Sequence, residues 1–193
     1  MANDKIQARI TLYNISEAGL YKRGEKAPIF GDLNIFLKDL KNWVSDKTLN
    51  KTCTYACLDG DESKTFCYDI QEGTQGHYLL ITWNKVSSFS NGVATVSGTS
   101  KVGEADIKTN NHNVDDIPGF PTYFWIMPDK NKLAAITFDY SQNGRQDLNR
   151  YLREFFGKLS GYVVSKVDDQ GVKVVEHYKD PKETEIYKVL WAV

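Results

Sequence analysis

The segment that decides the fold begins at Asp106-Ile107-Lys108, continues through Asp115-Asp116 and ends in Gly119-Phe120-Pro121-Thr122-Tyr123-Phe124-Trp125-Ile126. Aromatic residues crowd its last part, and such residues are enriched in β-strands. A second apolar run, Leu133 to Phe138, follows the turn-forming residues 128–131, Pro-Asp-Lys-Asn. The segment therefore predicts a polar connection that leads into an antiparallel β-hairpin.

An amphipathic helix is predicted on each side of this hairpin in the sequence. Before it, Asp32 can cap a helix in which apolar residues recur every three or four positions from Leu33 to Val44. After it, the same spacing runs from Gln146 to Leu159. Each apolar stripe needs a surface to cover, and a sheet supplies one. The sequence therefore predicts an α+β fold, with a mostly antiparallel sheet and the two helices packed on it.

Shorter strand-like runs fill the rest of the chain. Residues 6–12 alternate between apolar and polar side chains, which is typical of a half-buried strand. Further strand-like runs span Thr52 to Leu58, Thr65 to Ile70, Tyr78 to Phe89, 162–167, 172–178 and 185–192. Because the sequence shows neither an internal repeat nor a clear linker, we expect one domain over residues 1–160. The strands of residues 161–193 are expected to belong to the same domain.

The length, composition and net charge of the chain are those of an ordinary globular protein. The chain has 193 residues, of which 41% are hydrophobic, and its 24 basic and 25 acidic residues give a net charge of −1. A neutral total neither supports nor forbids a nucleic-acid partner, because such binding depends on where positive charges cluster. Three cysteines (Cys53, Cys57 and Cys67) and no secretory segment in residues 1–5 favour a cytoplasmic location. No apolar run is long enough to span a membrane as a helix.

Positive side chains gather in three places. They are Lys22, Arg23 and Lys26 in the first loop, Lys38 and Lys41 on the first helix, and Arg145, Arg150 and Arg153 on or beside the second. Lysine and arginine on one face displace the counterions of nucleic-acid phosphates, so all three patches are candidate DNA contacts. The arginines are the strongest candidates, because they outnumber the nearby Asp147 and Glu154. The alternative is a solvated helix face with ordinary ion pairs.

Motifs for catalysis are weak. The sequence has neither a phosphate-binding glycine loop nor a nucleophile elbow, and its three histidines are scattered. Asp106-Ile107-Lys108 and Asp180-Pro181-Lys182 each place a carboxylate two residues from a lysine, as a metal nuclease would need. Such a spacing is common by chance in a chain this rich in charge. We therefore expect a protein that is not an enzyme and uses neither cofactor nor metal.

The order of these elements resembles the N-terminal domain of the RexA family of lambdoid phage exclusion proteins, over roughly residues 8–160. The resemblance rests mainly on Asp106-Ile107-Lys108 leading through Asp115-Asp116 to Gly119-Phe120-Pro121. The residues 33–40 (Leu-Asn-Ile-Phe-Leu-Lys-Asp-Leu), 64–66 (Lys-Thr-Phe) and 147–152 (Asp-Leu-Asn-Arg-Tyr-Leu) add to it. The final thirty or so residues do not match the family. The resemblance implies a cytoplasmic, dimer-forming, DNA-binding protein of phage or prophage origin. Such proteins sense DNA of an incoming phage and signal to a membrane effector.

Three functions are therefore expected in order of preference. The first is sequence-independent binding to the DNA phosphate backbone within a phage exclusion or anti-phage defence system, with a second copy of the chain completing the groove. The second is a protein-interaction module that grips a host or phage protein through Tyr123, Trp125 or Trp191. The third is the metal-dependent nuclease.

Overall fold

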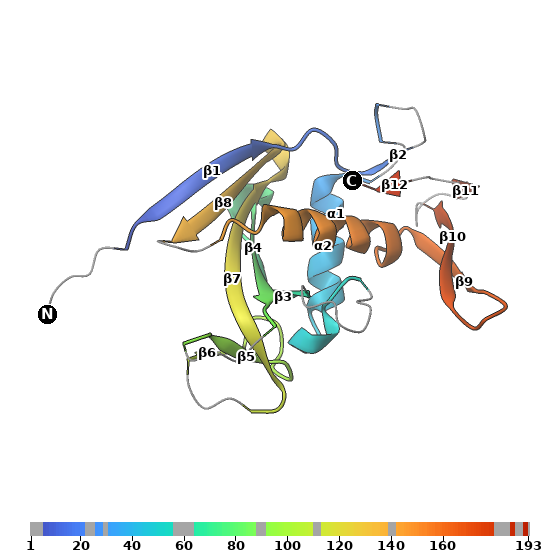
Figure 1. Cartoon of the computed structure of the whole chain (residues 1–193). Coiled ribbons are helices and arrows are strands. Elements are labelled where there is room, and N and C mark those ends of the chain that lie inside the picture. The colour runs from blue at the N-terminus through green and yellow to red at the C-terminus, as the bar shows by residue number, and fades with distance from the viewer. Residues whose placement is uncertain are drawn as a thin grey trace, which may run out of the picture.

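The computed structural model describes residues 6–21, 26–28, 31–55, 64–87, 92–109, 113–138 and 142–179, and the backbone of 186–187 and 191–192. Figure 1 shows these elements in their order along the chain. The helices are α1 (Leu33–Val44) and α2 (Arg145–Lys158), with short 3₁₀ turns at Leu49–Lys51, Thr74–Gly76 and Pro128–Lys130. The strands are β1 (Ala8–Asn14), β2 (Leu20–Tyr21), β3 (Thr65–Glu72), β4 (Tyr78–Lys85), β5 (Thr95–Ser97), β6 (Ile107–Lys108), β7 (Asp116–Met127), β8 (Lys132–Phe138), β9 (Val163–Val167), β10 (Lys173–Lys179), β11 (Ile186–Tyr187) and β12 (Trp191–Ala192).

The main sheet is antiparallel throughout the described residues. Its strands lie in the order β1-β8-β7-β4-β3, and the short strands β5 and β6 extend it from the first half of β7. The predicted hairpin is formed by β7 and β8, with Trp125 opposite Ala134. Asn131 adopts the left-handed conformation that this turn needs, with φ of 48°. The expectation of a mostly antiparallel α+β fold is confirmed.

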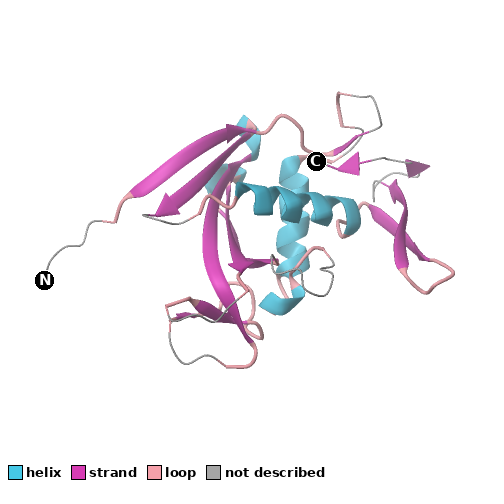
Figure 2. Ribbon diagram, in the orientation of Figure 1, coloured by secondary structure: helices cyan, strands magenta, loops and turns pink. Residues whose placement is uncertain are grey.

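Both helices cover the same face of this sheet. Asp32 caps α1 as the sequence predicts, since its Oδ1 accepts from the Ile35 backbone N–H at 2.8 Å. In Figure 2 the two helices cross each other on one side of the long strands. The Phe36 and Phe156 rings stack where they cross, with centroids 4.2 Å apart. The main core thus lies between the sheet and the crossed helices.

The conspicuous Asp-Ile-Lys to Gly-Phe-Pro segment has a structural role in this chain. Asp116 is buried and accepts a hydrogen bond from the Asn113 backbone N–H at 2.8 Å, while Lys108 Nζ lies 3.9 Å from its other oxygen. Gly119 faces the β4 backbone so closely that an added Cβ would lie 2.2 Å from the Asn84 carbonyl oxygen. These residues hold the start of β7 against β4 and over a second, smaller core around Trp83.

Two parts of the chain differ from the sequence pattern. The strand predicted from Thr52 to Leu58 is wrong over its described part, since residues 52–55 form no strand. There the Thr52 hydroxyl donates to the Leu49 carbonyl and accepts from the Cys67 N–H. These side-chain hydrogen bonds close the preceding 3₁₀ turn, and the backbone after it does not continue as a strand. The predicted strand 185–192 is present as the separate pieces β11 and β12.

The last strand returns to the beginning of the chain. β12 pairs with β2, with Trp191 opposite Tyr21 and Ala192 opposite Leu20. The Tyr178 hydroxyl donates to the Gly157 carbonyl at 2.9 Å, which ties β10 to the end of α2. The division of the chain near residue 160 stays a prediction. Neither described helix is long and apolar enough to cross a membrane.

Candidate nucleic-acid interface

The three arginines predicted on the second helix line one groove. α2 forms one wall, and residues 13–18, which are the end of β1 and the connection that follows it, form the other. This connection runs beside α2 in Figure 1. The groove has a volume of about 570 Å³, and its polar lining residues from α2 are Arg145, Gln146, Asn149, Arg150 and Arg153. We call this hollow the arginine groove.

Aromatic rings support two of the arginines. The Arg145 guanidinium lies over the Tyr13 ring, 4.9 Å from its centroid, and the Arg150 guanidinium lies over the Tyr55 ring at 3.9 Å. Such cation–π contacts favour a fixed plane for the guanidinium. Arg153 is exposed at the rim. Because the Arg145 contact is made through the ring face, it does not use the N–H groups at the edge of the Arg145 guanidinium.

A buried hydrogen-bond network holds the ring beneath Arg150. The Tyr55 hydroxyl donates to Thr65 Oγ1 at 3.2 Å and accepts from the Thr65 backbone N–H at 3.0 Å. Thr65 Oγ1 donates to Asn84 Oδ1, and Asn84 Nδ2 donates to Thr122 Oγ1. Burial raises the pKa of the Tyr55 hydroxyl, so that group stays protonated and continues to donate at neutral pH. The network therefore fixes Tyr55, and through it the Arg150 guanidinium, against β3, β4 and β7.

The N-terminal end of α2 is placed at the groove by Gly144. This residue adopts φ of 64°, and an added Cβ would lie 2.6 Å from Thr122 Cγ2, so a side chain fits neither the backbone conformation nor the space. As the N-cap, glycine offers no side-chain acceptor to the first-turn amides. The positive end of the helix dipole adds to the charge of Arg145 there.

Acidic residues offset part of this charge. Asp147 lies in the first turn of α2, and Glu17 lines the groove on the opposite wall. Glu154, which the sequence places beside Arg150 and Arg153, contacts Lys158 one turn further on. The α2 wall of the groove therefore keeps a local excess of positive charge.

The other predicted basic residues do not line this groove. Lys26 borders a separate hollow beside Asp32 and Asp129. Lys41 lies 3.8 Å from Glu72 on β3, and Lys38 is exposed on α1. The two remaining candidates, Lys22 and Arg23, lie outside the described residues.

Sequence patterns did not indicate the residues that support the arginines. Tyr13 belongs to the first strand and Tyr55 to an irregular segment, and both are far from α2 in the sequence. Nothing near Arg145 or Arg150 in the sequence points to these rings, because the contacts arise when β1 and the segment after the first 3₁₀ turn pack beside α2.

The acidic motifs considered for a nuclease do not form a cluster in the described residues. Asp106 is exposed, and Lys108 lies near the buried Asp116. No group of three histidine, cysteine, aspartate or glutamate side chains comes together among the residues the structure describes. Asp180-Pro181-Lys182 lies outside them.

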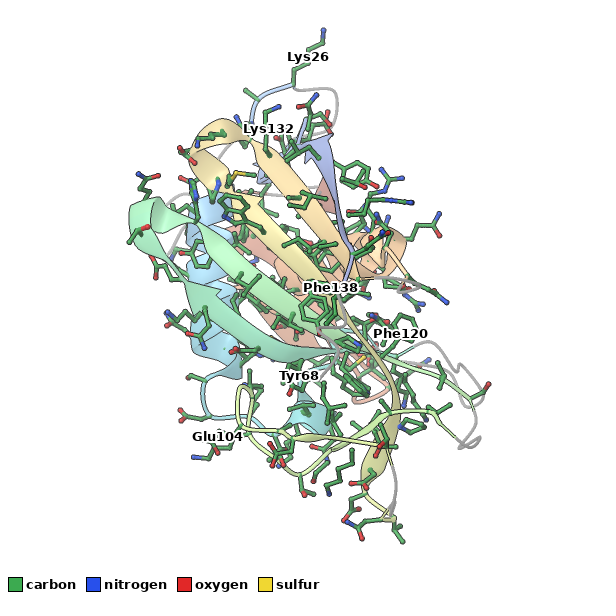
Figure 3. All side chains as sticks on the ribbon, turned by 90° about the vertical axis from the view of Figure 1, so that its left-hand side faces the viewer. Lys26, Tyr68, Glu104, Phe120, Lys132 and Phe138 are labelled. Carbon is green, nitrogen blue, oxygen red and sulfur yellow. The ribbon has the colours of Figure 1, made fainter. Side chains whose placement is uncertain are left out.

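A second surface lies on the sheet face opposite the helices, which Figure 3 shows with Phe138 near its centre. The register places Ile10, Ile136, Tyr123 and Ile81 in one row across this face, and Leu12, Ala134, Trp125 and Leu79 in the next. Five large apolar side chains here are between 39% and 61% exposed: Ile10, Leu12, Leu79, Trp125 and Phe138. We call this surface the outer sheet face.

Comparisons with family models, with curated proteins and with solved structures found no match for this chain. The chemistry of its surfaces is therefore the basis for assigning a function.

Proposed function

We propose that this protein binds DNA through phosphate contacts in the arginine groove, without reading the base sequence. One observation carries the proposal: three arginines from one helix line a single groove together with two side-chain amides. Guanidinium groups bind phosphate oxygens in a two-pronged geometry, and amide side chains position the backbone. Contacts of this kind go to the phosphates and sugars, so they carry no sequence information directly.

The biological setting follows from the resemblance to the RexA family. The protein would act in the cytoplasm as the DNA-binding component of a phage exclusion or defence system. A second copy of the chain would extend the basic surface along the duplex, and a membrane effector or a phage protein would receive the signal. Neither catalysis nor a cofactor is part of this proposal.

The proposal is tested by DNA binding at two salt concentrations. Wild-type protein is titrated into a short duplex of arbitrary sequence, with and without magnesium, and binding is followed by gel shift. Salt-sensitive retardation without cleavage is expected, and cleavage that depends on magnesium would favour the nuclease instead. Binding that does not change between roughly 50 and 200 mM salt would refute phosphate contacts as its basis.

Matched variants locate the site. Arg145→Glu with Arg153→Glu reverses two exposed charges in the groove, so the fold should survive while duplex affinity falls. Lys101→Glu with Lys173→Glu makes the same charge change at two exposed positions outside the groove. Equal losses in both double variants would show a diffuse charge effect and remove the groove from the site.

A second candidate function is supported by the outer sheet face. Contiguous exposed apolar side chains on a monomer mark protein-interaction sites, and Trp125 and Phe138 are the kind of aromatic anchors that such sites use. Trp191, the third aromatic residue predicted for this role, has no described side chain. Trp125→Ser with Phe138→Ser should remove salt-resistant capture of a protein from infected cells and leave DNA affinity unchanged. Capture that persists in this variant would exclude the outer sheet face.

A further inference from the structure

The arginine groove has an apolar floor that phosphate binding alone does not explain. Beneath the polar rim lie the buried side chains of Leu33, Ile126, Leu133, Leu148 and Phe156. Ile15 and Leu152 are partly buried and pack against the same core. Phosphate oxygens gain nothing from such a surface, because burial without hydrogen bonds penalises charged groups.

The size and the composition of the groove fit one compact, partly apolar ligand. Its volume of about 570 Å³ lies within the range of small-molecule sites, which combine apolar walls with a few polar groups. A continuous duplex backbone is too extended to fill a hollow of this kind, whereas one nucleotide has both an anionic and an aromatic part. The aromatic base can stack on a guanidinium plane, and the Arg145 guanidinium, which lies over the Tyr13 ring, offers one.

Charge sets the orientation of that ligand. The arginines all come from α2, while Glu17 lies on the connection that forms the opposite wall. A phosphate is attracted to the α2 wall and repelled by Glu17, so the base is directed toward the connection and the floor. There a carboxylate oxygen can accept from the exocyclic amino group of a base. Gln146 and Asn149 provide further donors and acceptors at the rim.

We infer that the arginine groove binds a single nucleotide whose base is unpaired, with its phosphate on Arg145 and Arg153 and its base on the apolar floor. This inference rests on the proposed function and names the ligand of the same site. A base inside a duplex cannot reach the floor, because it is held by stacking and pairing. The protein therefore prefers DNA that exposes a nucleotide, such as a bulge, a gap or a single strand.

The test compares two duplexes that differ by one unpaired nucleotide. Affinities of the full chain for a fully paired duplex and for the same duplex with a single-nucleotide bulge are measured by fluorescence anisotropy at one salt concentration. We expect the bulged duplex to bind about tenfold more tightly, which is within the range that stacking of one base contributes. Deoxyadenosine monophosphate is added as a competitor in a second series.

Two variants change the floor without changing charge. Ala18→Leu fills the groove from the connection, where Ala18 is partly buried, and Leu152→Asn makes the floor polar. Leu159→Asn is the matched control for Leu152→Asn, because Leu159, the residue after α2, is exposed and does not line the groove. Both floor variants should lose the preference for the bulge over the paired duplex, whereas the control should keep it.

The outcomes separate this inference from the proposed function. Salt-sensitive binding to the paired duplex with no preference for the bulge and no competition by the mononucleotide overturns the nucleotide site and leaves phosphate binding intact. A preference that survives in both floor variants also overturns it. Competition by the mononucleotide supports the site and assigns a free nucleotide as a ligand, whereas bulge preference without competition assigns the nucleotide to DNA. Failure to bind any DNA or the mononucleotide overturns both proposals.

Discussion

Replacing a single groove arginine should change how steeply DNA binding depends on salt. Arg153→Gln is the most informative substitution, because Arg153 is exposed at the rim of the groove. Glutamine keeps a polar side chain of moderate length but removes the charge. The expected effect is therefore on phosphate neutralisation and not on folding.

The magnitude follows from the number of arginines in the groove. If Arg145, Arg150 and Arg153 each neutralise one phosphate, the logarithm of the binding constant falls with the logarithm of salt concentration with a slope of about −2.7. A fourfold rise in salt then weakens wild-type binding about 40-fold. With one arginine removed, the slope becomes about −1.8 and the same rise in salt weakens binding about 12-fold.

The measurement is a series of anisotropy titrations with a paired duplex between roughly 50 and 200 mM salt, a range over which phosphate contacts change affinity strongly. Lys101→Gln is the control, since Lys101 is exposed and lies outside the groove. An unchanged slope in Arg153→Gln, or the same change in Lys101→Gln, would refute the assignment of phosphate contacts to this helix.

Three further predictions concern the fold. Gly119→Ala should lower the free energy of unfolding by about 3 kcal/mol in urea denaturation, because its Cβ would meet the β4 backbone, whereas Gly73→Ala, with 3.7 Å of room, should have little effect. Burial and the nearby Glu72 charge raise the pKa of Tyr78 to about 12, above the value near 10 of an unfolded tyrosine. The unfolded chain therefore loses its proton first, stability falls as pH rises from about 10 to 12, and this fall should be shallower in Tyr78→Phe. Burial also raises the pKa of the Cys67 thiol, which makes it a poor nucleophile in the folded protein. In a Cys57→Ser protein, a thiol reagent should therefore label Cys53 in the native state and Cys67 only after unfolding, as measured by mass spectrometry. Labelling of Cys67 in the native state would contradict its burial.

Periodicity was a sufficient guide to the main elements of the fold. The α1 helix begins where Asp32 predicted its cap, and β7 and β8 form the predicted hairpin. These signals are local, because capping and alternation depend on neighbours within a few residues. The segment at Thr52 misled the prediction because its threonine hydroxyl makes hydrogen bonds that no local pattern reveals.

For the candidate site too, some features follow from local sequence patterns and others only from tertiary structure. The sequence by itself determined which side of the second helix carries Arg150 and Arg153, since helical spacing places them on the face away from its apolar residues. Tertiary structure alone decided that a groove exists there, that Tyr13 and Tyr55 lie beneath Arg145 and Arg150, and that Lys38 and Lys41 lie elsewhere. The physical reason is that helix periodicity is set by the backbone geometry of one segment, whereas a groove forms between segments that are distant in the chain. Its walls meet only because the sheet and the crossed helices bury their apolar faces together.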